Sequence, residues 1–174
     1  MNKLHVYTGN GKGKTTAAMG LALRSAGHGN KVLVAQFMKR GNSGELKAFG
    51  CFDNVRVMTA NPIKGFTFRL TDEEKLSART DQTAFAEQVA LAIAEWQPQT
   101  IILDELGIAL ALDMVDENSA RELIETALSF GETAVTGREA PQWLSDKADY
   151  LSRITAEKHP YVTEKLPARK GVEW

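Results

Sequence analysis

A glycine-rich turn between a predicted strand and a predicted helix constrains the fold of this chain more than any other feature. Residues 8–16 read Thr-Gly-Asn-Gly-Lys-Gly-Lys-Thr-Thr and directly follow the apolar run at residues 4–7. Alternate glycines let the backbone fold tightly with its N–H groups pointing inward. Together with the N-terminus of the next helix, these groups bind anionic phosphate oxygens. The sequence therefore predicts a phosphate-binding loop.

This turn matches the P-loop of nucleotide-binding proteins, whose pattern is Gly, four residues, then Gly-Lys-Ser/Thr. Gly13, Lys14 and Thr15 fit, whereas Thr8 stands where the first glycine is expected. Lys14 supplies charge for the outer phosphates, and the Thr15 hydroxyl is suited to ligate Mg²⁺. A glycine-rich hairpin with solvated lysines is the alternative, but it leaves Lys12 and Lys14 unexplained. The predicted nucleotide-binding residues of the loop are Gly9, Asn10, Gly11, Lys12, Gly13, Lys14, Thr15 and Thr16.

Strand-like and helical segments alternate along the chain. The strand-like segments are residues 4–7, 31–37, 55–58, 100–103, 133–135 and 150–154. This alternation predicts an α/β fold with a mostly parallel sheet and helices on both faces. Because the phosphate loop joins the first strand to the first helix, we expect a RecA-like P-loop NTPase domain. A length of 174 residues suits a single core, so this domain is expected to cover residues 1–174. Prolines and a glycine in residues 158–174 predict an extended C-terminal tail.

Three helices are predicted from caps and apolar periodicity. The first follows the loop and stops near Gly27, where a left-handed cap is inexpensive. The second starts at Thr71, with Glu74 completing a capping box, and runs toward Trp96. The third covers residues 117–129, with Asp116 as its N-cap. Residues 38–50 and 61–70 lack such periodicity and are expected to be loops that can move.

Composition narrows the class of protein. The formal net charge of −1 argues against broad binding to nucleic acid or to a membrane surface, and no apolar stretch approaches a membrane span. Only three residues precede the first strand, which leaves no room for a signal peptide, so we expect a cytoplasmic protein. Cys51 is the single cysteine, expected to be a small buried thiol, and the three histidines are too far apart in sequence to suggest a metal site.

A second motif completes a candidate nucleotide site. Residues 100–103 are an apolar strand that ends in Asp104 and Glu105, the position where P-loop enzymes hold Mg²⁺ opposite a residue like Thr15. Acidic residues at a strand end are otherwise usually helix caps or solvated loop residues. Because ligands of open α/β sheets bind beyond the carboxyl ends of the strands, the phosphate loop favours the metal interpretation.

Arg138 follows the strand at residues 133–135, so it is expected at the carboxyl edge of the sheet, as Asp104 and Glu105 are. Its guanidinium can bind phosphate oxygens, although a surface arginine is an equally good interpretation of its position alone. A polyphosphate carries about three or four negative charges, which is more than Lys14 can neutralise. Lys12 and Arg138 are therefore included in the predicted site.

Together these motifs resemble the P-loop family of ATP:corrinoid adenosyltransferases, and the resemblance runs nearly end to end. Besides the loop, it rests on residues 36–39, 65–67, 103–106, 108–110, 136–138, 158–160 and 170–173. The resemblance implies attack of a reduced corrinoid on the 5′ carbon of ATP and release of triphosphate. It further implies ATP, Mg²⁺ and a corrinoid as ligands, an electron-donating flavoprotein, a homodimer, and catalytic roles for Lys12, Lys14, Arg138, Phe66 and Phe68. Thr15, Asp104 and Glu105 are the expected metal ligands.

Some positions depart from the family pattern. In the family, aromatic residues of a Gly-Phe-Thr-Trp segment lie under the corrin and displace its lower ligand. Here Phe68 replaces the tryptophan, keeping an apolar ring but losing the indole N–H. Gly107 and Glu139 replace common asparagines, and Arg169 stands where glutamine is frequent. These departures suggest a change in corrinoid preference or in rate.

Two other functions fit the same motifs. A P-loop kinase or ATPase would direct attack at the γ-phosphate, with Asp104 or Glu105 orienting the nucleophile. A carrier or sensor would bind ATP and a corrinoid but turn over poorly, as the departures at Phe68 and Gly107 allow. The products formed from ATP distinguish the first alternative, and the absence of an alkylated corrinoid distinguishes the second.

Overall fold

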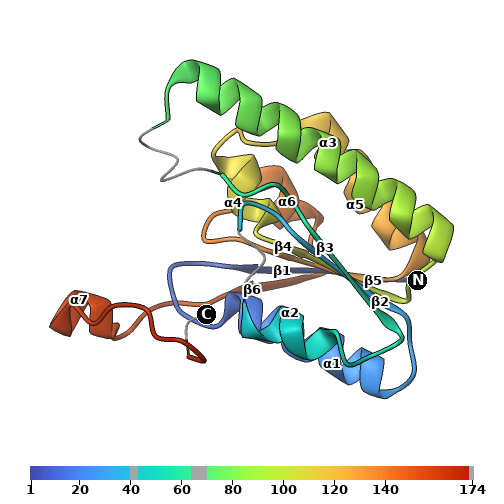
Figure 1. The fold of residues 1–174 in the computed structure, drawn as a ribbon, viewed down its shortest axis with the longest axis horizontal. Helices are drawn as coiled ribbons and strands as arrows, with labels where there is room; N and C mark the ends of the chain where they lie inside the picture. The colour runs from blue at the N-terminus through green and yellow to red at the C-terminus, as the bar shows by residue number, and fades with distance from the viewer. Residues whose placement is uncertain (40–42, 64–69, 173–174) are drawn as a thin grey trace.

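In the computed structural model, which describes residues 1–39, 43–63 and 70–172, a single parallel sheet forms the centre of the fold (Figure 1). Its strand order is β3-β2-β4-β5-β1-β6, and every neighbouring pair is parallel. The strands are β1 (Leu4–Thr8), β2 (Val32–Gln36), β3 (Val55–Thr59), β4 (Thr100–Asp104), β5 (Glu132–Thr136) and β6 (Tyr150–Arg153). The predicted α/β class and all six predicted strands are confirmed, and β5 lies between β1 and β4 as in RecA-like domains.

Helices connect the strands. They are α1 (Lys14–Gly27), α2 (Gly44–Phe49), α3 (Asp72–Trp96), α4 (Leu106–Ala111), α5 (Glu117–Phe130), α6 (Gln142–Lys147) and α7 (Pro160–Glu164). The predictions of α1, α3 and α5 are confirmed, including the capping box between Thr71 and Glu74 and the Asp116 cap. Helices α4 and α6 were not predicted, and α7 lies within the predicted tail.

The prediction of a loop over residues 38–50 is wrong in part, because α2 lies within it. Only Leu46 and Phe49 of this short helix are buried, one turn apart. A pattern of two apolar residues is too short to show a helical period. Most of the second predicted loop, residues 64–69, lies outside the described residues.

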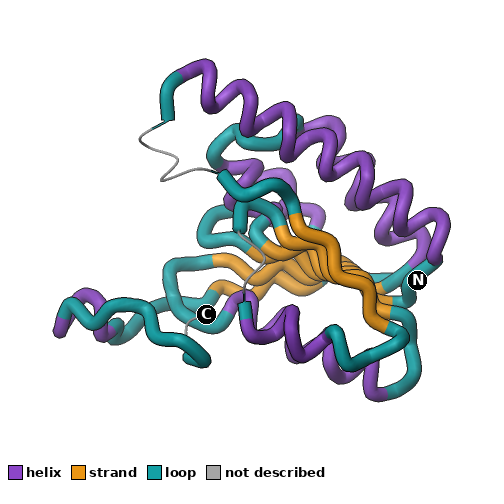
Figure 2. The backbone as a smooth tube through the Cα atoms, viewed as in Figure 1, coloured by secondary structure: helices purple, strands orange, loops and turns teal. Residues whose placement is uncertain are grey.

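Two layers of helices cover the sheet, as Figures 1 and 2 show. Helices α3, α4, α5 and α6 pack on one face, around a core that includes Phe85, Leu123 and Leu144. Helices α1 and α2 pack on the other face, around Ala22 and Phe49. Strands β2 and β4 are buried at every position because both of their faces are covered, as expected for a parallel sheet.

Two local predictions are wrong. Gly27 is the last residue of α1 and does not adopt a left-handed conformation; Gly29, two residues later, has a φ of 84° instead. Cys51 is exposed, not buried. It lies in the turn after α2, where its backbone N–H donates to the carbonyl of Ala48, while Phe49 fills the adjacent core position.

The carboxyl ends of β1, β4 and β5 lie at one edge of the sheet and bring distant parts of the chain together. The loop after β1 leads into α1, and the segment after β6 leaves from the same edge toward α7 (Figure 1). Among the described residues, none of the helices has both the length and the apolar character needed to cross a membrane.

Candidate functional site

The loop between β1 and α1 is held in place by segments that follow two other strands. The Gly9 N–H donates to the carbonyl of Arg138 at 3.1 Å, and the Gly11 N–H donates to the carbonyl of Ile154 at 2.8 Å. The Asn10 side-chain oxygen accepts from the Ala156 N–H at 3.0 Å. Because neighbours on both sides fix it, this loop is preorganised to present its remaining N–H groups.

Gly9 cannot be replaced without moving this structure. Its φ is 105°, and a Cβ at this position would lie 2.3 Å from the carbonyl oxygen of Ile154. Substituting Gly9→Ala is expected to lower the free energy of unfolding by about 1–3 kcal/mol and to weaken ATP binding, because the loop must separate from Ile154, directly after β6. Urea denaturation followed by calorimetric titration with ATP measures both effects.

Gly20→Ala is the matched control for this prediction. Gly20 lies in α1, and a Cβ there meets nothing within 4 Å. The change is expected to stabilise the protein by up to about 1 kcal/mol through helix propensity, with ATP affinity unchanged. Equal stability of the Gly9→Ala variant and the wild type would contradict the described loop geometry.

Lys14, the first residue of α1, directs its side chain back over the loop. Its Nζ donates to the carbonyl of Gly11 at 2.7 Å. Burial lowers the pKa of Lys14, and the positive charge of Arg138 acts in the same direction, whereas the negative charge of Glu105 opposes both. The loop therefore contains a partly desolvated ammonium group where the P-loop pattern predicts one.

Asp104, at the end of β4, is fully buried and accepts four hydrogen bonds. Its Oδ1 accepts from the hydroxyls of Thr15 at 2.9 Å and Thr136 at 2.7 Å. Its Oδ2 accepts from Gln36 Nε2 and from Lys39 Nζ, both at 2.9 Å. Burial alone would raise the pKa of Asp104, but the charge of Lys39 and the hydrogen bonds from Thr136, Gln36 and Lys39 outweigh burial and lower it. The carboxylate is thus kept ionised beside Thr15.

Lys39 completes this cluster, although no role was predicted for it. Its Nζ lies 2.9 Å from Asp104 Oδ2, 3.2 Å from Glu105 Oε1 and 3.2 Å from Thr15 Oγ1. Burial lowers the pKa of Lys39, but the charges of Asp104 and Glu105 outweigh that effect and raise it. One feature of the sequence points to a role in the site: Lys39 lies just beyond the end of β2, and β2 pairs with β4, which ends in Asp104. The three predicted metal ligands therefore surround one cationic group.

The oxygen atoms of Thr15, Asp104 and Glu105 fit a magnesium ion, since Mg²⁺ prefers hard oxygen ligands. Within the described parts of the chain, no three His, Cys, Asp or Glu side chains form a metal-binding group. The available donors would thus cover only part of an octahedral shell. That is the usual arrangement where Mg²⁺ binds through one or two protein groups, water and substrate phosphates.

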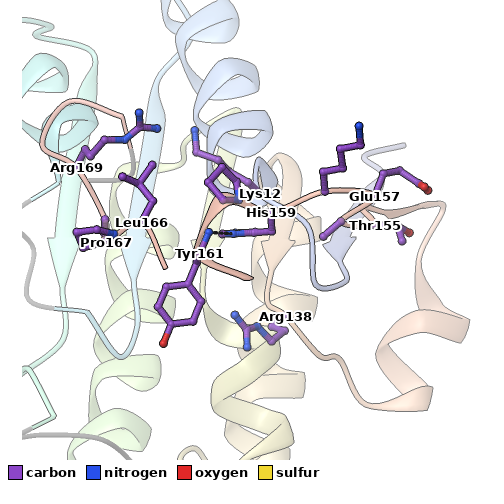
Figure 3. A pocket seen from close by; sticks show the side chains of 13 residues that line it. Lys12, Arg138, Thr155, Glu157, His159, Tyr161, Leu166, Pro167 and Arg169 are labelled. Carbon is purple, nitrogen blue, oxygen red and sulfur yellow. Dashed lines mark hydrogen bonds between the residues drawn. The ribbon is translucent and has the colours of Figure 1, made fainter. Parts of the chain in front are cut away.

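Lys12 and Arg138 lie apart from this cluster. Both are exposed, and both line a cavity of about 560 Å³ between the phosphate loop and the C-terminal tail (Figure 3). The tail contributes His159 and Tyr161 to the same cavity, and Figure 3 shows their side chains among those of Lys12 and Arg138. Such a volume falls in the usual range for small-molecule sites. The structure thus places two predicted cations at the rim of an open cavity beside the loop.

The departures from the family pattern occupy different places. A Cβ on Gly107 would lie 3.0 Å from the carbonyl oxygen of Glu139, so two of the departures are neighbours in space, and Glu139 directly follows Arg138. Arg169 lines the cavity beside the tail. Phe66 and Phe68 lie outside the described residues.

Comparison with known proteins agrees with the resemblance seen in the sequence. Residues 1–174 match the family model described as ATP:corrinoid adenosyltransferase BtuR/CobO/CobP. A corrinoid adenosyltransferase of Pseudomonas aeruginosa is 32% identical over 175 residues, covering 98% of this chain and 83% of that protein. Corrinoid adenosyltransferase CobA of Salmonella typhimurium is 30% identical over 173 residues, covering 97% and 84%. A corrinoid adenosyltransferase of Escherichia coli K12 is 31% identical over 160 residues, covering 90% and 78%.

Proposed function

This chain belongs to the ATP:corrinoid adenosyltransferase family, and we propose that its phosphate loop holds the triphosphate of ATP while the sugar end stays open to a reduced corrinoid. The enzyme transfers the adenosyl group of ATP to the corrinoid. In this step the cobalt electron pair forms a bond to the 5′ carbon of the ribose. The bond from that carbon to oxygen breaks, and triphosphate leaves with the electron pair.

Positive charges are grouped around the loop, and this grouping is the main support for a triphosphate site there. Lys14 lies within the loop, and Lys12 and Arg138 lie at the rim of the adjacent cavity. We propose that all three contact the triphosphate. Because negative charge accumulates on this leaving group in the transition state, fixed cations stabilise the transition state more than the bound substrate.

We propose that Mg²⁺ accompanies ATP and is held by Thr15, Asp104 and Glu105. When bound, it would neutralise phosphate charge and so improve triphosphate as a leaving group. Thr15 lies at the start of α1, directly after the loop, so its hydroxyl is within reach of both the phosphates and the end of β4. The buried, ionised Asp104 fixes that hydroxyl at 2.9 Å.

The cavity of about 560 Å³ is the proposed place for the sugar end of the nucleotide. It begins at Lys12 and Arg138, where the triphosphate would end, and extends to the tail residues. Holding the 5′ carbon in a fixed position facing the corrinoid removes much of the entropic cost of the reaction. We further propose, from the family, a homodimer, an electron-donating flavoprotein, and the cytoplasm as the compartment.

The decisive experiment is an anaerobic assay with ATP, Mg²⁺ and chemically reduced cobalamin. We expect the visible spectrum of the alkylated corrinoid to appear together with inorganic triphosphate in equal amounts. ADP and orthophosphate, formed without a change in the corrinoid spectrum, would indicate a kinase or ATPase. Tight binding of both ligands without turnover would indicate a carrier or sensor.

We propose that Phe66 and Phe68 contact the corrin face and help displace its lower ligand. Phe68→Trp is expected to convert cob(II)alamin at an equal or faster rate, because the larger indole ring covers more area. Stopped-flow spectroscopy with a chemical reductant measures the rate. Phe52→Trp is the control: Phe52 follows α2 and packs beside Phe49 at the edge of the core under α1 and α2, so its replacement is expected to leave the rate unchanged. A large loss in the Phe68→Trp variant would mean that this segment is misaligned with the family.

A further inference from the structure

Three oxygen atoms that would ligate Mg²⁺ surround the ammonium group of a lysine. Lys39 Nζ lies 2.9 Å from Asp104 Oδ2 and 3.2 Å from each of Glu105 Oε1 and Thr15 Oγ1. These distances are those of charge-assisted hydrogen bonds and somewhat longer contacts of the same kind. The pocket thus already contains one positive charge at the point where its oxygens converge.

The backbone before Lys39 directs it toward this point. Met38 has a φ of 62°, and the Lys39 N–H donates to the carbonyl of Phe37 at 2.6 Å, so the chain makes a γ-turn at the end of β2. The Met38 N–H donates to Gln82 of α3 at 3.1 Å, which fixes the turn against the core. A non-glycine residue in this conformation is strained, and such strain is common at functional sites. The turn returns the chain toward the end of β4.

The hydrogen bonds of Asp104 leave no position for a second cation. Two hydroxyls occupy Oδ1, while Gln36 and Lys39 occupy Oδ2, so all four acceptor positions of the carboxylate are used. A magnesium ion that takes one of these oxygens must displace a donor. Lys39 is the donor that can leave, because its side chain is 35% exposed and has a flexible stem, whereas Gln36 and Thr136 are buried.

We propose that Lys39 is a positioning residue that acts as a tethered cation: it occupies the magnesium position in the nucleotide-free enzyme and yields to the metal when Mg²⁺ arrives with ATP. This inference rests on the proposed role of Thr15, Asp104 and Glu105 as metal ligands. In the free enzyme, Lys39 holds these three side chains together and keeps the buried Asp104 charge paired. Two positive groups cannot share the pocket, so free divalent metal binds weakly until phosphate oxygens come with it.

The consequence is an ordered arrival of ligands. Without nucleotide, a divalent ion must displace Lys39 and gains only the protein oxygens. With ATP, the same ion also gains phosphate oxygens, and the displaced ammonium lies beside a triphosphate that attracts it. Metal binding therefore depends on nucleotide, and the pocket does not fill with free metal between turnovers.

The test is Mn²⁺ binding to the full chain without nucleotide, measured from the electron paramagnetic resonance signal of free Mn²⁺. Lys39→Met removes the charged group and keeps an unbranched side chain one atom shorter, and we expect the variant to bind Mn²⁺ at least about tenfold more tightly than the wild type. Lys39→Arg keeps the charge and is expected to bind as weakly as the wild type. Lys147→Met, which removes a surface lysine paired with Glu125, is the matched control and should also match the wild type.

A second uncharged variant covers the case in which Lys39→Met does not fold. Lys39→Gln retains a hydrogen-bond donor for Asp104 and is expected to show the same gain in Mn²⁺ affinity. Circular dichroism checks that each variant is folded. Wild-type affinity in the folded uncharged variants would overturn the proposal, and so would equally tight binding to Lys39→Arg.

The same titration with ATP separates this inference from the proposed function. We expect the wild type and the Lys39→Met variant both to bind Mn²⁺ tightly when ATP is present. If the wild type with ATP binds no Mn²⁺ beyond that held by ATP in solution, the assigned metal ligands are wrong. If ATP does recruit Mn²⁺ but loss of the Lys39 charge leaves nucleotide-free binding unchanged, only the role of Lys39 is wrong.

Discussion

Replacing Lys14 with alanine is expected to abolish measurable ATP binding and to lower the rate of adenosyl transfer by at least about 100-fold. Lys14 Nζ lies 2.7 Å from the Gly11 carbonyl, within the loop that would enclose the phosphates. We do not expect Lys12 or Arg138 to replace its charge, because both are exposed at the cavity rim and lie outside the position that Lys14 occupies over the loop. Calorimetric titration with ATP and the anaerobic assay measure the two effects.

Lys31→Ala is the control for this variant. Lys31 precedes β2 at the opposite end of the sheet, where its Nζ donates to the carbonyl of Trp96 at 3.2 Å. Its loss is expected to leave ATP affinity and transfer unchanged. Unchanged ATP affinity in a folded Lys14→Ala variant would count against the phosphate-binding role of the loop.

Asp104→Asn is expected to have the second largest effect, because it removes a buried charge that four donors surround. The asparagine oxygen could still accept from Gln36 and Lys39, but the amide NH₂ would then face the Thr15 and Thr136 hydroxyls, which would have to reverse and accept. Lys39 would also lose the negative charge with which it pairs. Removing one partner of a buried ion pair costs about 3–5 kcal/mol. Since Lys39 is partly exposed, we expect a loss of about 1–3 kcal/mol in unfolding free energy.

The same variant is expected to lose most of its transfer activity and its dependence on divalent metal. Thr15 loses the acceptor that fixes its hydroxyl, and the pocket loses one negative charge. Urea denaturation measures stability, and the anaerobic assay over a range of Mg²⁺ concentrations measures activity. Asp113→Asn is the control, because Asp113 pairs with Arg79 on the surface. Wild-type metal dependence in Asp104→Asn would exclude Asp104 from the metal site.

The stability difference between the wild type and Asp104→Asn depends on pH. The pKa of Asp104 is lowered in the folded protein, so its stabilising contribution is present above the ordinary aspartate pKa of 3.8. That contribution is lost as the pH falls through the lowered folded value. The difference between the two proteins is therefore expected to be constant above about pH 5 and to shrink below about pH 4, which urea denaturation at several pH values checks.

The strands and the phosphate loop could be predicted from the sequence because each is encoded locally. Short apolar runs specify β1 and β4, and the order of glycines, Lys14 and Thr15 specifies the loop between β1 and α1. The pairing of Thr15 with Asp104 was expected from the P-loop pattern, and the two side chains lie at hydrogen-bond distance. Local pattern and tertiary structure agree in this half of the site.

The sequence shows that Lys39 follows a predicted strand, but it does not show the contact of Lys39 with Asp104 and Glu105. This contact depends on β2 lying beside β4 and on the γ-turn at Met38, neither of which has a local sequence signal. Helix α2 was missed because two buried residues do not define a period, and Cys51 was misplaced because residue type alone does not show which side of a turn faces the core. These features follow from long-range packing.

The phosphate loop and the residues after β6 are joined by hydrogen bonds and close packing, so they are expected to move together. Gly9 and Gly11 pack against Ile154, and Asn10 is bonded to Ala156, from which the chain continues directly into the tail. A ligand that shifts the tail is therefore expected to shift the loop backbone that we propose binds the nucleotide. If the loop binds the nucleotide as proposed, a change in the tail alters nucleotide affinity without touching the nucleotide itself.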